Sequence, residues 1–215
     1  MTPAEIQFGR RPCQPTEPRD RSLQGAHFEY GVTPFYFLRH GETRENREGI
    51  LQGQNETELN SAGHQMAEAA AEALSDVALG SIYASPLKRA WHTASIVSGM
   101  TGVPVYLRPG LMERHWGAFQ GQPKAERPLT PNPETVETVE DFKDRVTRAM
   151  ASIAGPPPVL VVAHSGVFRA ICETVGIAKD SRICVATGQV AKFEPPMAFG
   201  REWRISLLAT AEDGP

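Results

Sequence analysis

The sequence lacks any long apolar run. No stretch of eighteen or more apolar residues occurs in the 215 residues, and residues 1–32 lack the apolar segment of a secretory signal. Glu5, Glu17, Asp20 and Glu29 in the same region argue against a transit peptide, because such peptides are poor in acidic residues. We therefore expect a cytoplasmic protein that does not insert into membranes.

The sequence also has few cysteines and no net positive charge. Cys13, Cys172 and Cys184 are odd in number and have no paired short spacing, which argues against a disulfide framework and a zinc site. We expect these thiols to be reduced and structural, and we predict no metal and no cofactor. Because the net charge is −3, no general basic field exists for nucleic acid or an anionic membrane. Any binding of phosphate must then come from a local cluster of residues.

The chain length fits one domain that is preceded by an extension. Residues 1–32 contain four prolines and show neither helical nor strand periodicity, so we expect a mobile or loosely docked segment. From residue 33 to residue 215 the pattern is that of a single folded domain.

Apolar runs in this domain alternate with helical patterns. Predicted strands are Phe35 to Leu38, Ser81 to Ala84, Val103 to Leu107, Val159 to Ala163, Gly188 to Glu194 and Trp203 to Ala209. Predicted helices start near Ser61, Pro86, Thr138 and Val167. This order predicts an α/β fold with a mostly parallel central sheet of about five to six strands and helices on both faces.

The helical spacing also predicts which side chains face the core. The expected inward residues are Met66, Ala69, Ala70, Ala73 and Leu74 in the first helix, Leu87, Ala90, Trp91, Ala94 and Val97 in the second, and Val139, Phe142, Val146, Met150 and Ile153 in the third. Trp203 is expected in the core as well. The charged residues between Glu134 and Arg148 are expected to form a solvated helix face.

Two histidines follow buried strands directly, in Arg39-His40-Gly41 and His164-Ser165-Gly166. Ligands of such sheets collect beyond the carboxyl ends of the strands, so neighbouring strands would open both histidines into one crevice. By the same rule Arg89, which follows Ser85, and Glu113 belong to that crevice. A neutral imidazole can attack phosphorus, guanidinium groups can neutralise the phosphoryl oxygens, and a carboxylic acid can protonate the leaving oxygen.

Four ordered blocks resemble the histidine phosphatase superfamily, also called the phosphoglycerate mutase-like family, over about residues 35–209. They are Leu38-Arg39-His40-Gly41-Glu42-Thr43 with Asn46, Ser85-Pro86-Leu87-Lys88-Arg89-Ala90, Glu113-Arg114-His115-Trp116-Gly117, and Val162-Ala163-His164-Ser165-Gly166. The resemblance implies a metal-independent catalytic domain of phosphoglycerate mutase-like fold. Its implied nucleophile is His40 and its general acid, then base, is Glu113.

The same resemblance implies a phosphate pocket made by Arg39, Arg89 and His164, with Asn46 and the backbone amide of Ser165 as further donors. Thr43, Arg114 and Trp116 are candidates for lining the substrate opening. Most family members have a second glycine where Ser165 stands, and we expect this difference to tune the site without abolishing it.

Several residues have competing interpretations. Glu42 and Glu126 are alternative carboxylic acids, His27, His64 and His115 are expected to be surface or supporting residues, and His92 is expected to be solvated.

The reaction and the substrate also stay open. Phosphoglycerate mutases of the resembled family carry a long, arginine-bearing insertion after the Glu113 block that closes the site. Residues 121–137 are instead short and proline-rich, with only Lys124 and Arg127 as basic candidates, so hydrolysis of a small phosphomonoester is favoured over mutase chemistry. A noncatalytic phosphate-binding protein is a third possibility. Residues 52–60 and 121–137 are expected to select the substrate. The oligomeric state is open, with a homodimer allowed.

Overall fold

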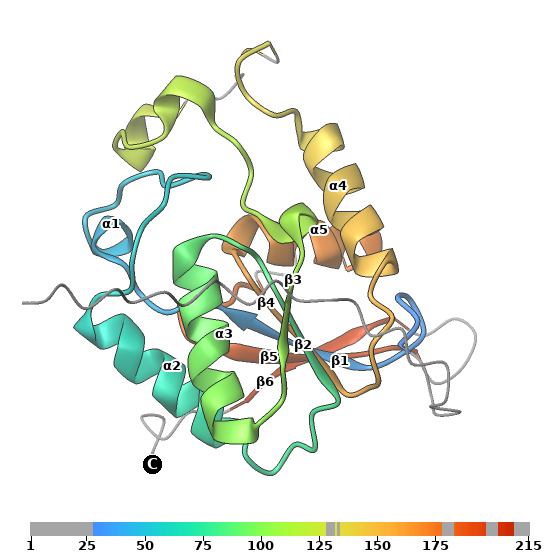
Figure 1. The fold of residues 1–215 in the computed structure, drawn as a ribbon. Coiled ribbons are helices and arrows are strands. Elements are labelled where there is room, and N and C mark those ends of the chain that lie inside the picture. Colours follow the sequence, from blue (N-terminus) through green and yellow to red (C-terminus); the bar gives the residue numbers. More distant parts are fainter. Residues whose placement is uncertain (1–27, 128–131, 133, 178–182, 197–201, 209–215) are drawn as a thin grey trace, which may run out of the picture.

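The computed structural model describes residues 28–127, 132, 134–177, 183–196 and 202–208, which form a mixed α/β domain (Figure 1). Its six-stranded sheet has the order β3-β2-β4-β1-β5-β6. The strands are β1 (Phe35–Arg39), β2 (Ser81–Ala84), β3 (Val105–Leu107), β4 (Val159–Ala163), β5 (Val190–Glu194) and β6 (Arg204–Leu207). Strands β3, β2, β4 and β1 are parallel, and β5 and β6 join antiparallel at one edge. The predicted mostly parallel sheet is confirmed.

The central strands are buried on both faces, which explains their continuous apolar sequences. All five residues of β4 and all four of β2 are buried. In register, Arg39 pairs with Ala163 and Ala84 pairs with Val162, so β1, β2 and β4 end at nearly the same level. The residues that follow these three strands are therefore brought to one edge of the sheet.

Helices cover both faces of the sheet (Figure 1). The helices are α1 (Arg44–Arg47), α2 (Ser61–Ala73), α3 (Lys88–Thr101), α4 (Val139–Ala151) and α5 (Ser165–Thr174), with short 3-10 turns η1 (Pro109–Leu111), η2 (Gly117–Phe119) and η3 (Lys124–Glu126). Helices α2 and α3 pack with Leu38, Ile82 and Leu160, whereas α4 and α5 pack on the opposite face. None of the helices in the described ranges is long and apolar enough to cross a membrane.

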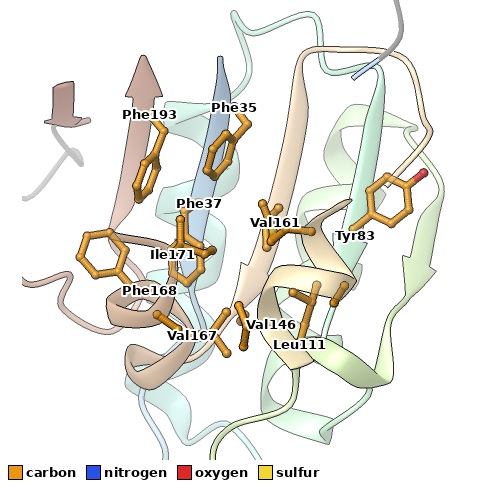
Figure 2. Packing of buried hydrophobic residues seen from close by; sticks show 14 of the residues in the cluster. Phe35, Phe37, Tyr83, Leu111, Val146, Val161, Val167, Phe168, Ile171 and Phe193 are labelled. Carbon is orange, nitrogen blue, oxygen red and sulfur yellow. The ribbon is translucent and has the colours of Figure 1, made fainter. Parts of the chain in front are cut away.

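The core under α4 and α5 is rich in aromatic rings (Figure 2). Phe35 and Phe193 stack with ring centroids 4.6 Å apart, and Phe37 meets Phe168 at 5.3 Å. Phe28 is also buried there, 5.9 Å from Phe35, although the sequence assigns it to the extension. Trp203 is half-buried against the same ring, at 6.2 Å. The rest of the predicted extension, residues 1–27, lies outside the described residues.

Two helices differ in part from their predicted inward faces. In α2 the buried residues are Gly63, Ala67, Ala70 and Ala71, followed by Leu74, so the assignment of Met66, Ala69 and Ala73 to the core is wrong. Alanines occur on every side of this helix, so its faces differ little in hydrophobicity and the inward face is hard to predict. In α3, Arg89 and Thr93 point inward with Ala90, Ala94 and Val97, and Trp91 is 43% exposed. Trp91 is therefore not a core residue.

Candidate active site

The ends of β1 and β4 bring the two predicted histidines together. Because these strands are neighbours, His40 and His164 leave the sheet side by side, with ring centroids 5.1 Å apart. The backbone N–H of His40 donates to the carbonyl of Ala163 at 3.0 Å. The expectation that both histidines meet at one edge of the sheet is confirmed.

A cavity of about 640 Å³ opens beside His40. Predicted site residues in its lining are Arg39, His40, Asn46, Arg89, Glu113 and Ser165. Seven lysines and arginines line it, against two glutamates, although the whole chain has a net charge of −3. This excess of positive charge favours an anionic ligand in the cavity.

His40 is held in one tautomer. Its Nδ1 lies 2.8 Å from the carbonyl oxygen of Gly41, and since a carbonyl only accepts, Nδ1 carries the hydrogen. The other ring nitrogen, Nε2, then has a lone pair. Burial, followed by the positive charges of Arg89 and Arg39, holds the pKa of His40 well below its usual range. The imidazole is thus neutral at neutral pH and able to act as a nucleophile.

The glycine after His40 is required by close packing of backbones. A Cβ on Gly41 would collide with the backbone of Gly63 at the start of α2. The N–H of Gly41 donates to Oγ1 of Thr93 at 3.0 Å, and this hydroxyl donates to the carbonyl of Arg89. These contacts fix the turn that carries His40 against α3.

Arg89 is a buried cation held by the loop of residues 52–60. Its guanidinium donates to the carbonyls of Gly53 and Asn55 at 2.7 and 2.9 Å and to Oγ1 of Thr57 at 3.1 Å. Burial lowers its pKa to about 10, so it remains charged at neutral pH. Arg39 is held similarly, by a 3.0 Å bond from its guanidinium to the carbonyl of Val185.

His164 packs beside His40 and is not among the residues that line the cavity. It is fully buried, and its Nε2 lies 2.8 Å from Oγ of Ser85. Burial, followed by the charge of Arg89, also holds the pKa of His164 well below its usual range. The prediction that it lines the phosphate pocket is therefore not met: both ring nitrogens are enclosed, and one of them is bonded to Ser85.

Two buried nitrogens of residues that line the cavity have no hydrogen-bond partner among the described residues: Nε of Arg39 and Nε of Arg89. Unpaired buried polar atoms are uncommon in folded proteins. Their gathering around one cavity supports the binding of a polar, anionic group at this place.

The carboxylate of Glu113 follows η1 and is fixed by two backbone amides. Arg114 N–H donates to Oε1 at 2.8 Å and Gly166 N–H donates to Oε2 at 3.0 Å. Of the alternative acids, Glu42 is paired with Arg47 at 2.7 Å, and neither Glu42 nor Glu126 lines the cavity. Glu113 is thus the carboxylate, of these three, that faces the reaction space.

An ion pair that the sequence did not suggest supports Glu113. Arg145, on α4, donates to both carboxylate oxygens of Glu137 at 2.8 and 2.9 Å. The same guanidinium donates to the carbonyls of Gly110, Met112 and Glu113 at 2.9, 3.0 and 3.3 Å. The expectation of a fully solvated face between Glu134 and Arg148 is wrong for these residues, because the loop after β3 folds over them.

The remaining predicted residues occupy different positions. Asn46 lines the cavity while its Oδ1 accepts from the N–H and hydroxyl of Thr43, which caps α1. Thr43 is fully buried and does not line the cavity, so its assignment to the substrate opening is wrong. Ser165 is the first residue of α5, where free N–H groups favour anions.

Trp116 and Arg114 form part of the cavity wall. The guanidinium of Arg114 lies 4.3 Å from the ring centroid of Trp116, and that of Arg127 lies 5.2 Å from it. Lys124 also lines the cavity, and burial, followed by the charge of Arg39, lowers its pKa. This wall adds positive charge at the opening.

The other histidines and the cysteines occupy varied positions. His64 and His115 are exposed, His92 is half-buried, and His27 and Cys13 lie outside the described residues. Cys172 is buried, whereas Cys184 is exposed and lines the cavity, so the structural interpretation of this thiol is wrong. Within the described ranges no group of three or more His, Cys, Asp or Glu side chains is placed to hold a metal ion.

Comparison with known protein families identifies the superfamily of this chain. Residues 35–194 match the histidine phosphatase superfamily (branch 1), and the chain belongs to this superfamily.

Named relatives include phosphatases and a mutase-like protein. The chain is 35% identical over 156 residues to phosphoglycerate mutase-like protein 4 of Arabidopsis thaliana, covering 63% of this chain and 68% of that protein. It is 35% identical over 163 residues to a metal-independent phosphoserine phosphatase of the same plant, covering 66% and 68%. A mycobacterial glucosyl-3-phosphoglycerate phosphatase, solved with VO3, superposes with a TM-score of 0.68 at 26% identity and covers 84% of this chain and 100% of its own.

Proposed function

We propose that the protein is a phosphatase that hydrolyses small phosphomonoesters through a phosphohistidine on His40. The observation that carries this proposal is the 2.8 Å contact between Nδ1 of His40 and the carbonyl of Gly41. It leaves the lone pair of Nε2 as the nucleophile in a cavity rich in positive charge.

In the first step Nε2 of His40 attacks phosphorus in line and the ester P–O bond breaks. Glu113, protonated, gives its proton to the leaving oxygen so that the product departs as a neutral alcohol. The new phosphohistidine keeps its hydrogen on Nδ1, where the carbonyl of Gly41 accepts it and stabilises the positive charge of the ring.

In the second step the Glu113 carboxylate takes a proton from water as the water oxygen attacks phosphorus. The N–P bond breaks, and its electrons return to Nε2 of His40. We assign the phosphoryl oxygens to Arg39, Arg89, Asn46 and the backbone N–H of Ser165, which line the cavity around the nucleophile. The charges of the two arginines would provide the neutralisation that a metal ion provides elsewhere, so the proposed reaction needs no metal.

His164 is assigned a supporting role. Its ring packs 5.1 Å from that of His40 and is anchored to Ser85 at 2.8 Å. Packing of the His164 ring against the His40 ring limits the rotation of the nucleophile and keeps its Nε2 directed toward the cavity.

Mutase chemistry is the main competing function, and the similarity to a mutase-like protein supports keeping it. Both reactions use the same phosphohistidine and differ only in whether water or a second alcohol accepts the phosphoryl group. If the purified protein interconverts 3- and 2-phosphoglycerate faster than it releases phosphate, the mutase assignment replaces hydrolysis.

A panel of phosphomonoesters, assayed with and without a chelator, tests the proposal. We expect phosphate release that is insensitive to chelator and absent in His40→Ala. Release that survives the substitution would contradict the assignment of the nucleophile. Tight phosphate binding without any turnover would favour the noncatalytic alternative.

A further inference from the structure

The cavity continues beyond His40 along one side of α5. Ser165, Arg169 and Glu173 recur every four residues, which places them on one face of the helix, and all three line the cavity. Eight residues of α-helix correspond to about 12 Å of axis, so the cavity extends well beyond the size of a phosphate group.

Helix α4 contributes an apolar surface to this extension. Its stripe of apolar residues begins in the core with Val146 and Met150, which are fully buried. The stripe then continues through Phe142 to Val139, and both of these side chains line the cavity. Val139 is 41% exposed although the sequence predicted it to face the core. The apolar stripe thus extends one helical turn beyond the core, and the side chains of this extra turn face the cavity.

Positive charge is unevenly distributed along the cavity. Lys143 of α4 and Glu173 of α5 form an ion pair of 2.8 Å, so their charges offset each other where the two helices meet. Arg169 is closer to the phosphate end than Glu173, since it lies one helical turn from Ser165 on α5. The part of the cavity lined by Val139, Phe142, Lys143, Ala170 and Glu173, here called the α4–α5 arm, is therefore apolar and nearly neutral.

We propose that the α4–α5 arm binds the apolar alcohol portion of an extended phosphomonoester, an inference that rests on the proposed function. The arm is continuous with the site of His40, so an ester with its phosphorus there directs its alcohol portion into the arm. A three-carbon backbone, with bonds of about 1.5 Å, spans about 3 Å and would leave most of the arm unfilled. The preferred substrate is then longer than a three-carbon acid.

Binding of n-alkylphosphonates tests the arm without requiring hydrolysis, because their C–P bond is not an ester bond. We expect calorimetry to show the dissociation constant falling from methyl- to hexylphosphonate by about fourfold per methylene, which corresponds to ~0.8 kcal/mol for each buried group. Val139→Asp should reduce this dependence on chain length. An acidic residue is tolerated in the first turn of a helix, so α4 should remain folded, and a thermal melt checks this.

Val32→Asp is the matched control, because Val32 is also an exposed valine but does not line the cavity. It should keep the wild-type dependence on chain length. Equal affinity for methyl- and hexylphosphonate would contradict binding of the alkyl chain in the α4–α5 arm. The same dependence of affinity on chain length in Val139→Asp as in the wild type would contradict it as well. Tighter binding of a carboxyl-terminated alkylphosphonate than of hexylphosphonate would overturn its apolar assignment. Phosphate release from p-nitrophenyl phosphate by the same preparation reports on the proposed function separately.

Discussion

The backbone N–H of Gly166 donates to Oε2 of Glu113 at 3.0 Å, joining the loop after β3 to the first turn of α5. A side chain on residue 166 would occupy the place of that carboxylate, because a Cβ built there collides with Oε1 of Glu113. Glycine at this position leaves room for the Glu113 carboxylate, and the start of α5 helps to place that side chain.

Gly166→Ala should displace Glu113 and slow departure of poor leaving groups. We expect kcat for alkyl phosphates to fall by about tenfold or more, because displacement removes part of the roughly 10²- to 10⁴-fold contribution of a positioned general acid. The loss should be smaller for p-nitrophenyl phosphate, whose leaving group needs no proton. Gly99→Ala in α3 is the control, since a Cβ there meets open space. Equal losses on both esters would argue against displacement of the acid.

Glu113→Gln removes the proton that the leaving oxygen receives. Alkyl phosphate hydrolysis should fall by about 10²- to 10⁴-fold, while inhibition by inorganic phosphate stays near the wild-type value. Steady-state kinetics with phosphate as a competitive inhibitor measure both quantities. A parallel loss of phosphate affinity would show that Glu113 acts in binding and not as the acid.

Arg145→Met should act on Glu113 from a distance. The substitution removes five hydrogen bonds, two to Glu137 and three to carbonyls between Gly110 and Glu113. We expect the free energy of unfolding to fall by about 1–3 kcal/mol, because the half-buried Glu137 loses its partner. A purely structural role would slow all esters alike. We expect a greater loss on alkyl phosphates than on p-nitrophenyl phosphate.

Arg148→Met on the same helix is the control for that experiment, since its side chain is exposed. It should leave stability and both rates near the wild-type values. A similar change in both variants would show that the hydrogen bonds of Arg145 to the loop before Glu113 have no specific effect on stability or catalysis.

Stability should fall as the pH decreases below about 6.5. Burial lowers the pKa values of His40 and His164 in the folded protein, whereas the unfolded chain titrates near 6.5. Below that pH the unfolded state binds more protons, so the free energy of unfolding decreases by up to about 1.4 kcal/mol per pH unit for each histidine. Urea denaturation between pH 7.5 and about 5 measures this. His164→Gln should reduce the slope, and an unchanged slope would contradict the buried neutral state of His164.

Much of the fold could be predicted because its strands are short and clearly bounded. The ranges Ser81–Ala84 and Val159–Ala163 match β2 and β4, since a polar residue or glycine follows or precedes each apolar run. Helix α4 starts near Thr138 as predicted, and the Thr138 hydroxyl caps it by accepting from the N–H of Asp141 at 3.0 Å. Placement of His40, Arg89 and Glu113 at one edge of the sheet followed from the rule on strand ends.

The errors arise where tertiary contacts override local pattern. Thr93 turns inward because its hydroxyl accepts from the N–H of Gly41, which no helical spacing could reveal. Arg145 could not be told from a solvated arginine, because its three carbonyl partners come from a loop 32 to 35 residues earlier in the chain. Val139 continued an apolar stripe, and only the cavity shows what that residue faces.

Trapping of the phosphoenzyme tests the central claim most directly. A rapid acid-free quench after mixing with a ³²P-labelled ester, followed by mass spectrometry of peptides, should find one phosphoryl group on Nε2 of His40, labile to acid and stable to alkali. The label should be absent in His40→Ala. Turnover without a trapped phosphoryl group, or a label on another residue, would contradict nucleophilic catalysis by His40.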